Sequence, residues 1–539
     1  MELIYSFTVA LFLTIALIPV LIKYSAQLQL LDDPNDSRKV HEVAIPRSGG
    51  LAIAIGVFLP LVFMLPVGAE FKGLLSGAVI IVIFGILDDR FELNYKWKFL
   101  GQIIAVIAVM SAGILIHRVP FLGFADAPLW VVYPLTFLFL LGVTNAVNLT
   151  DGLDGLAAGT TLLSLVLITI FALKIDYAPV ALVSLTVIGG VLGFLRYNTF
   201  PARIFMGDTG SQFLGFTAAT LAVLVSQAET AAFSPAVPLL ILGLPILDTI
   251  MVMSIRLKER RSPFSPDKNH LHHQLMALGF RHYEAVALIY LAQIALVLSA
   301  YLFCYESDVF VLIYYVTFCA VILGFLFVSN RRQWRIRNDE PVENIEDRRN
   351  KILRKMEWVY QFSSHVVEVM VAVILVSSAI LVSDIRGDFA ITALVLAVVL
   401  TGLWWFFRAS PAIVTRATGY TASVFVVYLF SVSELANNSH LVVDGLLLAL
   451  ALFLMLSIRM TRREEFRLDT QDLLILLMIV VVPQLPLAAM DQLSLGQVVL
   501  RLAALMYACE FILAKNRTSF RCLNAGAILS LVILASHGI

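Results

Sequence analysis

Long hydrophobic runs, separated by short polar segments, follow one another along almost the whole chain. A membrane-spanning helix needs about 20 consecutive apolar residues, and most of these runs are close to that length. The pattern therefore predicts an all-α polytopic membrane protein with about eighteen helices. These lie near residues 3–22, 48–66, 73–87, 99–116, 128–146, 156–173, 178–195, 210–227, 236–255, 285–303, 309–328, 360–383, 389–407, 412–432, 441–458, 471–489, 495–514 and 522–537.

A strongly charged segment, residues 329–357, interrupts this pattern. Its many Arg, Lys, Asp and Glu residues are typical of a solvated linker with a basic helix beside the membrane. We predict three parts: a core of about eleven spans at 1–330, a charged cytoplasmic linker at 331–357 and an extension of about seven spans at 358–539. No internal repeat suggests a transporter built from two inverted halves.

Basic residues alternate between the two sets of loops. Up to residue 355, one set holds 24 Lys and Arg residues, whereas the other holds three, Lys72, Arg118 and Lys174. Loops rich in Lys and Arg remain in the cytoplasm. We therefore expect the N-terminus outside and the basic loops in the cytoplasm.

Composition agrees with a membrane protein and narrows the function. Of 539 residues, 60% are hydrophobic and 14% charged, against roughly 25% charged in soluble proteins. The net charge is zero, and no basic tract is interleaved with aromatic residues, so we expect no nucleic-acid partner. The four cysteines lack metal-ligand spacing and imply no disulfide framework. The first run lacks a basic segment before it and a small-residue cleavage site after it, so we expect a retained span rather than a signal peptide.

Polar residues gather in five predicted cytoplasmic loops of the core. The first loop carries Arg38, Lys39 and His41, which could hold phosphate, and ends in Gly49-Gly50, which permits close backbone approach. The second carries the adjacent carboxylates Asp88 and Asp89. Such a pair repels itself and is a usual way to hold Mg²⁺ on a diphosphate, although a solvated turn would have the same composition.

The third and fourth loops combine carboxylates, amides and glycines. Asn145, Asn148, Asp151 and Asp154 lie within ten residues, and the neighbouring glycines predict an ordered turn rather than a helix. Oxygen ligands of this kind suit a hard cation and a ribose. In the fourth loop, Asp208 lies beside a glycine at a predicted helix start, which suits either a phosphate site or a simple N-cap.

The fifth loop contains three histidines in four residues, His270, His272 and His273. A transition-metal site is one interpretation. We favour hydrogen-bond donors to phosphate or sugar, because the other polar loops contribute no matching cysteine or further histidine.

Together the five loops resemble those of the polyprenyl-phosphate N-acetylhexosamine-1-phosphate transferase family, the polytopic phosphoglycosyl transferases of glycosyltransferase family 4. The resemblance covers about residues 1–330, and its eleven spans are similar to the branch that transfers GlcNAc-1-phosphate to undecaprenyl phosphate. The branch that transfers phospho-muramoyl-pentapeptide ranks second, because it usually carries Thr-Met-Gly-Gly where this chain has Arg47-Ser48-Gly49-Gly50. The segments that carry the resemblance are PNDSRKVHEVAIPRSGG, GILDDRFE, NAVNLTDGLDGLAAG, RIFMGDTGSQFLG and SPDKNHLHHQL.

The resemblance implies transfer of a HexNAc-1-phosphate, with GlcNAc the commonest sugar, from a UDP-sugar to undecaprenyl phosphate. The products are UMP and a lipid-linked sugar that initiates a cell-envelope glycan such as O-antigen, teichoic acid or capsule. It also implies a bacterial inner membrane, an active site facing the cytoplasm, and Mg²⁺ as cofactor, with Mn²⁺ as the alternative.

The resemblance assigns roles residue by residue. Asp208 resembles a Mg²⁺ ligand with Asn148 as the second, and Lys98 matches a phosphate-binding lysine. Asp88, Asp89 and Asp151 are the expected catalytic or supporting carboxylates, positioning the lipid phosphate or acting as a base. The remaining expected substrate-binding residues are Asp154, Asn198, Phe205, His270, His272, His273, Arg38, Lys39 and His41.

Two other functions remain open at this stage. A flippase or transporter of lipid-linked sugars would carry its charges at the bilayer midplane, whereas these gather at one interface. Residues 358–539 contain no comparable site and could dock other glycan-assembly membrane proteins, and a homodimer is a further expectation. The sequence does not reveal the donor sugar.

Overall fold

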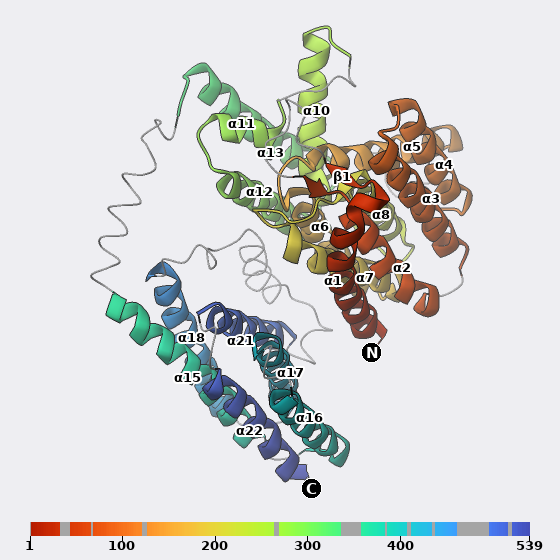
Figure 1. Cartoon of the computed structure of the whole chain (residues 1–539). Coiled ribbons are helices and arrows are strands. Elements are labelled where there is room, and N and C mark those ends of the chain that lie inside the picture. The colour runs from red at the N-terminus through yellow and green to blue at the C-terminus, as the bar shows by residue number, and fades with distance from the viewer. Residues whose placement is uncertain are drawn as a thin grey trace. The chain divides into compact units, whose positions relative to one another are not determined.

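The computed structural model describes residues 2–32, 44–65, 68–120, 127–262, 269–335, 357–382, 385–406, 411–433, 437–460, 495–515 and 520–538. The described helices fall into two compact units, helices α1 to α13 and helices α15 to α22 (Figure 1). Within the described residues, eleven helices are long and apolar enough to cross a membrane. The prediction of an all-α polytopic membrane protein is therefore confirmed.

The first unit contains all eleven elements that the hydrophobic runs predict. Ten runs form single helices, and a two-stranded antiparallel ribbon, β1 (Leu31–Asp32) with β2 (Ile45–Pro46), joins the first two. The helices are α1 (Glu2–Leu28), α2 (Gly49–Met64), α3 (Ala69–Phe91), α4 (Tyr95–Ser111), α5 (Leu129–Thr150), α6 (Leu156–Lys174), α7 (Ala178–Asn198), α8 (Gly207–Gln227), α9 (Pro238–Ile241), α10 (Gly243–Lys258), α11 (Leu271–Ala277), α12 (His282–Leu302) and α13 (Asp308–Arg331).

The single span expected at 236–255 is wrong in one respect, because the structure divides it into α9 and α10. Pro245 explains the break. A proline has no amide hydrogen to donate, and its ring collides with the carbonyl four residues earlier, which here belongs to Ile241, the last residue of α9.

Helix α8 lies at the centre of the first unit. It packs against α2, α3, α5 and α6, and its apolar window is completely buried. Small residues let its neighbours approach closely: a Cβ added at Gly50 would lie 2.5 Å from the Cα of Gly210, and one at Gly85 would lie 2.4 Å from the Cα of Thr209. The polar residues at the start of α8 therefore lie among other helices.

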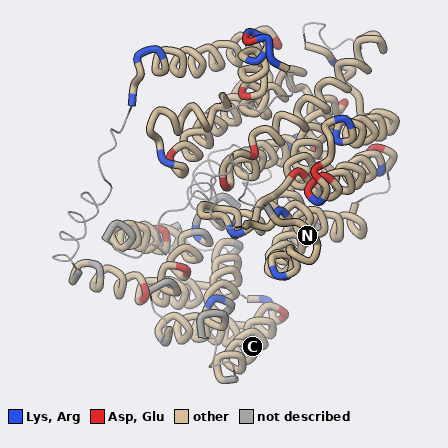
Figure 2. Tube along the Cα trace, turned by 45° about the horizontal axis from the view of Figure 1, so that its top comes forward, with Lys and Arg blue, Asp and Glu red and all other residues tan. Residues whose placement is uncertain are grey.

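Charged residues are sparse along the helices of this unit and gather near the helix ends (Figure 2). The end at which α3 and α5 finish is also the end at which α4 and α8 begin, because ion pairs and hydrogen bonds join these termini directly. Helix α6 begins at the same end, after the short turn that follows α5. Polar chemistry is thus concentrated at one end of the unit.

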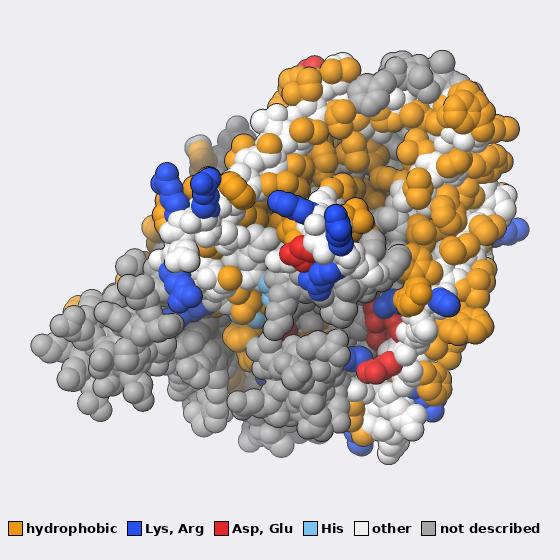
Figure 3. All heavy atoms as spheres, turned by 90° about the horizontal axis from the view of Figure 1, so that it is seen from above, with side chains coloured by type: hydrophobic (Ala, Val, Ile, Leu, Met, Phe, Trp, Pro, Cys, Tyr) orange, Lys and Arg blue, Asp and Glu red, His pale blue; other side chains and the backbone are white. Residues whose placement is uncertain are grey.

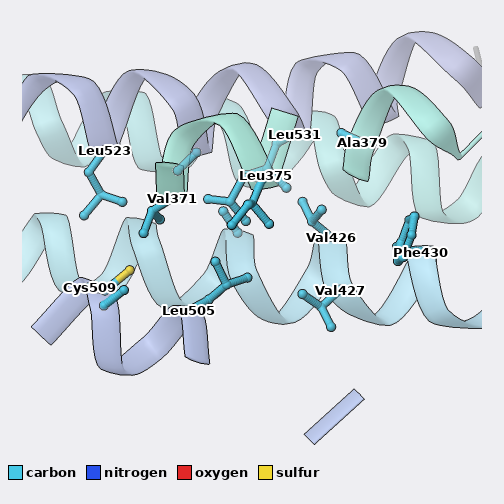
Figure 4. Close-up of a cluster of buried hydrophobic side chains, with 14 of the residues drawn as sticks. Val371, Leu375, Ala379, Val426, Val427, Phe430, Leu505, Cys509, Leu523 and Leu531 are labelled. Carbon is cyan, nitrogen blue, oxygen red and sulfur yellow. The ribbon is translucent and has the colours of Figure 1, made fainter. Parts of the chain in front are cut away.

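The second unit is a bundle of helices around its own apolar core. Buried side chains from all six described helices meet there, among them Leu375, Phe430, Leu505 and Leu531 (Figure 4). The helix expected at 471–489 lies outside the described residues. The described helices are α15 (Glu357–Leu381), α16 (Gly387–Phe406), α17 (Pro411–Val432), α18 (Asn437–Met460), α21 (Leu495–Lys515) and α22 (Arg521–Gly538).

Candidate active site

Lys98 links two carboxylates from different helices. Its Nζ, on the first turns of α4, lies 2.9 Å from Asp88 Oδ2 at the end of α3 and 2.7 Å from Asp208 Oδ1 at the start of α8. Asp88 is 6% exposed. The expectation that Asp88 and Asp89 occupy a loop is wrong: α3 continues through both to Phe91, because their carboxylates face neighbouring helices rather than water.

Asp89 has a different set of partners from Asp88. Its carboxylate accepts hydrogen bonds from the backbone N–H groups of Asp208 (2.8 Å) and Thr209 (3.0 Å), and from the Thr209 hydroxyl. These amides belong to the first turn of α8, which has no intrahelical acceptors for them. Asp89 therefore caps α8 across the interface and fixes the position of Asp208.

Asn148 completes this cluster from the last turn of α5. Its Nδ2 donates to Asp208 Oδ1 and to Ser211 Oγ, the latter at 2.8 Å. Asn145 is helical, as the run at 128–146 predicts, but the ordered turn expected after it is only partly correct, since Asn148 is also helical and the turn begins at Asp151. Helix continues because both amides find partners on α4 and α8.

A polar cavity of about 300 Å³ opens beside the cluster. Figure 3 shows acidic and basic side chains side by side on the face that it views, among hydrophobic surface. Twelve residues line the cavity: Arg47, Asp89, Asn148, Asp151, Gly152, Leu153, Asp154, Asn198, Phe205, Gly207, Asp208 and Ser211. Seven of these are residues that the sequence predicts for the site.

Two of the lining residues also hold the cavity wall together. Asn198 accepts from the N–H of Gly155 at 2.9 Å and donates to the carbonyl of Ile204 at 2.8 Å. Asp154 accepts from the N–H of Ala202 at 2.9 Å. The loop before α6 and the loop before α8 are therefore tied to each other at the cavity.

The glycine pair, which is expected to permit close backbone approach, lies against the segment before α8. Gly49 donates its N–H to the carbonyl of Phe205 (2.9 Å), and Gly50 donates to that of Met206 (2.8 Å). A Cβ at Gly49 would lie 2.7 Å from the Phe205 oxygen. The other predicted residues of the first loop, Arg38, Lys39 and His41, lie outside the described residues.

The histidines occupy α11 and its N-terminal flank. His270 Nδ1 lies 2.9 Å from the buried Asp248 of α10, and His272 packs against both other histidine rings. His272 also touches the cavity loop, because a Cβ at Gly152 would lie 2.4 Å from its Nε2. The structure therefore brings His272 beside the loop of Asp151 and Asp154 and orients His270 through Asp248.

Two groups of the site outside the spans have shifted pKa values. Desolvation, followed by the negative charges of Asp208, Asp89 and Asp154, raises the pKa of Asp151 to about 8. Asp151 is still exposed to solvent. A cation bound among these carboxylates would reduce their mutual repulsion and so reverse that part of the rise in the pKa of Asp151. Burial, followed by the charge of His273, lowers the pKa of His272 to about 3, so His272 is neutral at pH 7.

The oxygen donors where the end of α5 meets the start of α8 fit a Mg²⁺ ion. In the described part of the chain, no three His, Cys, Asp or Glu side chains are grouped as a metal-binding set. Mg²⁺ requires less, since one or two carboxylates usually hold it together with waters and phosphate oxygens. Asp208, Asn148 and Ser211 meet that requirement at the cavity surface, and the assignment of Asp208 and Asn148 as ligands stays a prediction.

Sequence reasoning missed Asp248, Arg47 and Ser211 as members of the site. Asp248 carried a usable signal, because a lone carboxylate inside an apolar run is costly in a membrane and needs a partner. Arg47 and Ser211 lie within the sequence motifs, but no feature of the sequence separates them from ordinary loop residues.

Comparison with known proteins places this part of the chain in context. Residues 71–226 match the model of glycosyl transferase family 4, a range that contains Asp88, Lys98, Asn148 and Asp208. The chain is 40% identical over 302 residues to the "Probable undecaprenyl-phosphate N-acetylglucosaminyl 1-phosphate transferase" of Bacillus subtilis (strain 168), covering 56% of this chain and 84% of that protein.

Two further relatives have similar names. The undecaprenyl-phosphate alpha-N-acetylglucosaminyl 1-phosphate transferase of Yersinia pestis is 32% identical, over 54% of this chain and 80% of its own length. The decaprenyl-phosphate N-acetylglucosaminephosphotransferase of Mycolicibacterium smegmatis is 35% identical, over 47% of this chain and 70% of its own length.

Proposed function

Because the chain belongs to the polyprenyl-phosphate N-acetylhexosamine-1-phosphate transferase family, we propose that it transfers GlcNAc-1-phosphate from UDP-GlcNAc to undecaprenyl phosphate. The observation that carries the proposal is the meeting of Asp88, Lys98 and Asp208 beside a polar cavity at one end of an apolar helical unit. The relatives named above support the sugar and the lipid.

In the proposed reaction, an oxygen of the lipid phosphate attacks the β-phosphorus of the UDP-sugar. The bond between that phosphorus and the bridging oxygen breaks, and UMP leaves with the bridging oxygen. Both reactants are negatively charged, so repulsion is the main obstacle. Lys98 supplies a positive charge, and Asp88 holds its ammonium group in place.

Mg²⁺ fits the same end of α8 in this proposal. Asp208 and Asn148 would hold it, and when bound it would neutralise charge on the diphosphate. The cavity residues Asp154, Asn198 and Phe205 would form the uridine pocket, with His272 and His273 beside the diphosphate or sugar. In this arrangement Asp89 acts through α8, whose start it fixes.

We further propose that the site faces the cytoplasm of a bacterium, with the N-terminus outside, and that the product initiates a cell-envelope glycan. The excess of Lys and Arg in the loops at the site end supports this orientation. A membrane-impermeant thiol reagent tests it: a cysteine replacing the exposed Glu92 should react in inverted vesicles and not in intact cells. Labelling in intact cells would reverse the orientation.

Release of UMP by the purified full-length chain tests the reaction. With UDP-GlcNAc, undecaprenyl phosphate and Mg²⁺, we expect UMP and a lipid-linked sugar in equal amounts, and chelation with EDTA should stop the reaction until Mg²⁺ or Mn²⁺ is restored. A panel of UDP-sugars, including UDP-GalNAc and UDP-MurNAc-pentapeptide, determines the donor. Failure to release UMP from every donor would refute the transferase proposal.

Two lysines on α4 provide a matched pair of variants. Lys98→Met should lower kcat by about 100-fold or more, because it removes a charge aimed at the phosphates. Lys96→Met removes an exposed lysine two residues away and should leave kcat within about twofold. Equal losses in the two variants would contradict the role given to Lys98.

A further inference from the structure

A layer of three amide side chains, two of them buried and one half-buried, lies next to the charged cluster. Gln102 Nε2 donates to Gln212 Oε1 at 2.9 Å and to Asn145 Oδ1 at 3.3 Å, and Asn145 Nδ2 returns a hydrogen bond to Gln102 Oε1 at 2.8 Å. Gln102 is 1% exposed and Gln212 is 2% exposed. These side chains join α4, α5 and α8 without any charged group.

Each amide lies one helical turn from a residue of the charged cluster, on the same helix. Gln102 follows Lys98 by four residues on α4, Asn145 precedes Asn148 by three on α5, and Gln212 follows Asp208 by four on α8. Residues three or four apart share one face of a helix. The amide layer is therefore a second set of contacts among the helices that present Lys98, Asn148 and Asp208.

The amide layer is suited to fixing these helices at a site where charge changes. In the charged cluster, contacts between Lys98 and the carboxylates must rearrange when anionic phosphates arrive, whereas neutral amides keep their hydrogen bonds. A buried amide that loses its partner is costly, so each helix has a strongly preferred rotation and register.

Stability alone does not explain Gln212. Its Nε2 is buried, and it has no hydrogen-bond partner among the residues that the structure describes. A buried donor without an acceptor costs stability that an apolar side chain of the same shape would not. The hydrogen bond that Gln212 accepts from Gln102 is therefore offset in part by this unpaired donor.

We propose that Gln102, Asn145 and Gln212 are positioning residues that hold α4, α5 and α8 in the register required for Lys98, Asn148 and Asp208 to act together. This inference rests on the proposed transferase function. The amides touch no substrate in this proposal and act through the charged cluster one turn away.

Methionine variants test the inference, because methionine is close to glutamine in shape and has no amide. Gln102→Met and Gln212→Met should each lower kcat by about 10-fold to 100-fold, the loss expected when reacting groups are displaced by about an ångström. KM for UDP-GlcNAc should change by less than about threefold, because the proposed uridine pocket of Asp154, Asn198 and Phe205 contains no residue of α4 or α8.

A third buried glutamine of the same unit serves as the control. Gln293 of α12 is fully buried and donates to Ser164 Oγ (3.0 Å) and to the carbonyl of Ile241 (2.8 Å). Gln293→Met should lower the unfolding temperature, measured without Mg²⁺, at least as much as Gln102→Met does, yet keep kcat within about threefold. Gln212→Met removes an acceptor of Gln102 but also a buried unpaired donor, so it should lower the unfolding temperature no more than Gln293→Met does, while kcat falls.

The outcomes separate the two proposals. If the unmodified chain releases no UMP, the proposed function fails and the positioning role fails with it. If the unmodified chain is active and Gln102→Met and Gln212→Met keep kcat within threefold, only the positioning role is refuted. The positioning role would also be refuted if kcat fell in proportion to the unfolding temperature in all three variants.

Discussion

Asp88 and Asp89 are neighbours in the chain, yet their carboxylates have separate partners. Asp88 forms an ion pair with Lys98 on α4, whereas Asp89 accepts three hydrogen bonds from the start of α8. Successive residues on a helix are about 100° apart around its axis, so the last turn of α3 can face both helices at once. This pair of adjacent aspartates therefore provides one carboxylate for the charged cluster and one that caps the start of α8.

Substitution of each aspartate by asparagine should separate these roles. Asp89→Asn keeps one acceptor oxygen but loses the charge and one hydrogen-bonding oxygen, so the free energy of unfolding should fall by about 1–2 kcal/mol. Asp88→Asn should change stability less, because Lys98 keeps Asp208 as a partner, but should lower kcat by about 100-fold. Thermal unfolding and UMP release measure the two effects.

The pH dependence of Asp88→Asn adds a further distinction. If Asp88 only holds Lys98 and the lipid phosphate, the loss of kcat should be constant from pH 6 to pH 9. Recovery of activity at high pH would instead indicate that Asp88 accepts a proton during the reaction.

His272 should make the fold sensitive to acid. Its pKa of about 3 lies below the value of about 6.5 in an unfolded chain, so between these values the unfolded state binds a proton that the folded state does not. The stability contributed by neutral His272 is thus complete above pH 6.5 and declines as the pH falls, by up to about 1.4 kcal/mol per pH unit. In His272→Gln, unfolding measured from pH 7 to pH 5 should depend less on pH, and an unchanged slope would contradict this account.

At the scale of elements, the hydrophobic runs predict most helices of the first unit, because lipid requires long uninterrupted apolar segments. Helix ends near the site are predicted less well. Asp88 and Asn148 resemble loop residues in the sequence, but each finds a partner on another helix and the helix continues through it. Partners such as Gln102 and Gln212 could not be predicted, because a lone amide in an apolar run does not reveal which helix faces it.

The close approach of α2 to α8 is an element-scale feature that a single methyl group should disrupt. In Gly50→Ala, the added Cβ would lie 2.2 Å from the backbone nitrogen of Gly210, so the start of α8 must move. We expect a loss of about 1–3 kcal/mol in unfolding free energy and a larger relative loss in kcat. Gly142→Ala is the control, since nothing lies within 4 Å of a Cβ there and alanine favours helix. Equal stability of the two variants would show that the approach is looser than described.

At the scale of the whole molecule, the two units have separate apolar cores, and the residues of the candidate site all belong to the first. The second unit has polar contacts of its own, including the pair of Arg501 with Asp444 and that of Arg416 with Glu510. The sequence predicts a boundary in the charged segment because charge density changes sharply there. No comparable sequence pattern indicates the role of the extension.

Removal of the second unit should leave the transferase reaction intact. A chain ending at residue 338 keeps every described contact of the site, so kcat and both KM values should stay within about twofold of the intact chain. Complete loss of activity in a shortened chain that is monodisperse and unfolds cooperatively would show that the extension contributes to catalysis.

The burial of α8 has a consequence for how the protein is made. Among the eleven apolar helices, α8 has the lowest mean hydropathy, 1.3, because protein rather than lipid surrounds it. Such a segment gains little from entering lipid alone, so its insertion during synthesis should depend on the helices already in the membrane. The ribosome produces α2, α3, α5 and α6 before α8. The helices that pack around α8 are therefore already made when α8 is synthesised. Moving the α8 segment in front of its neighbours should therefore impair membrane integration, even with every residue of the site retained.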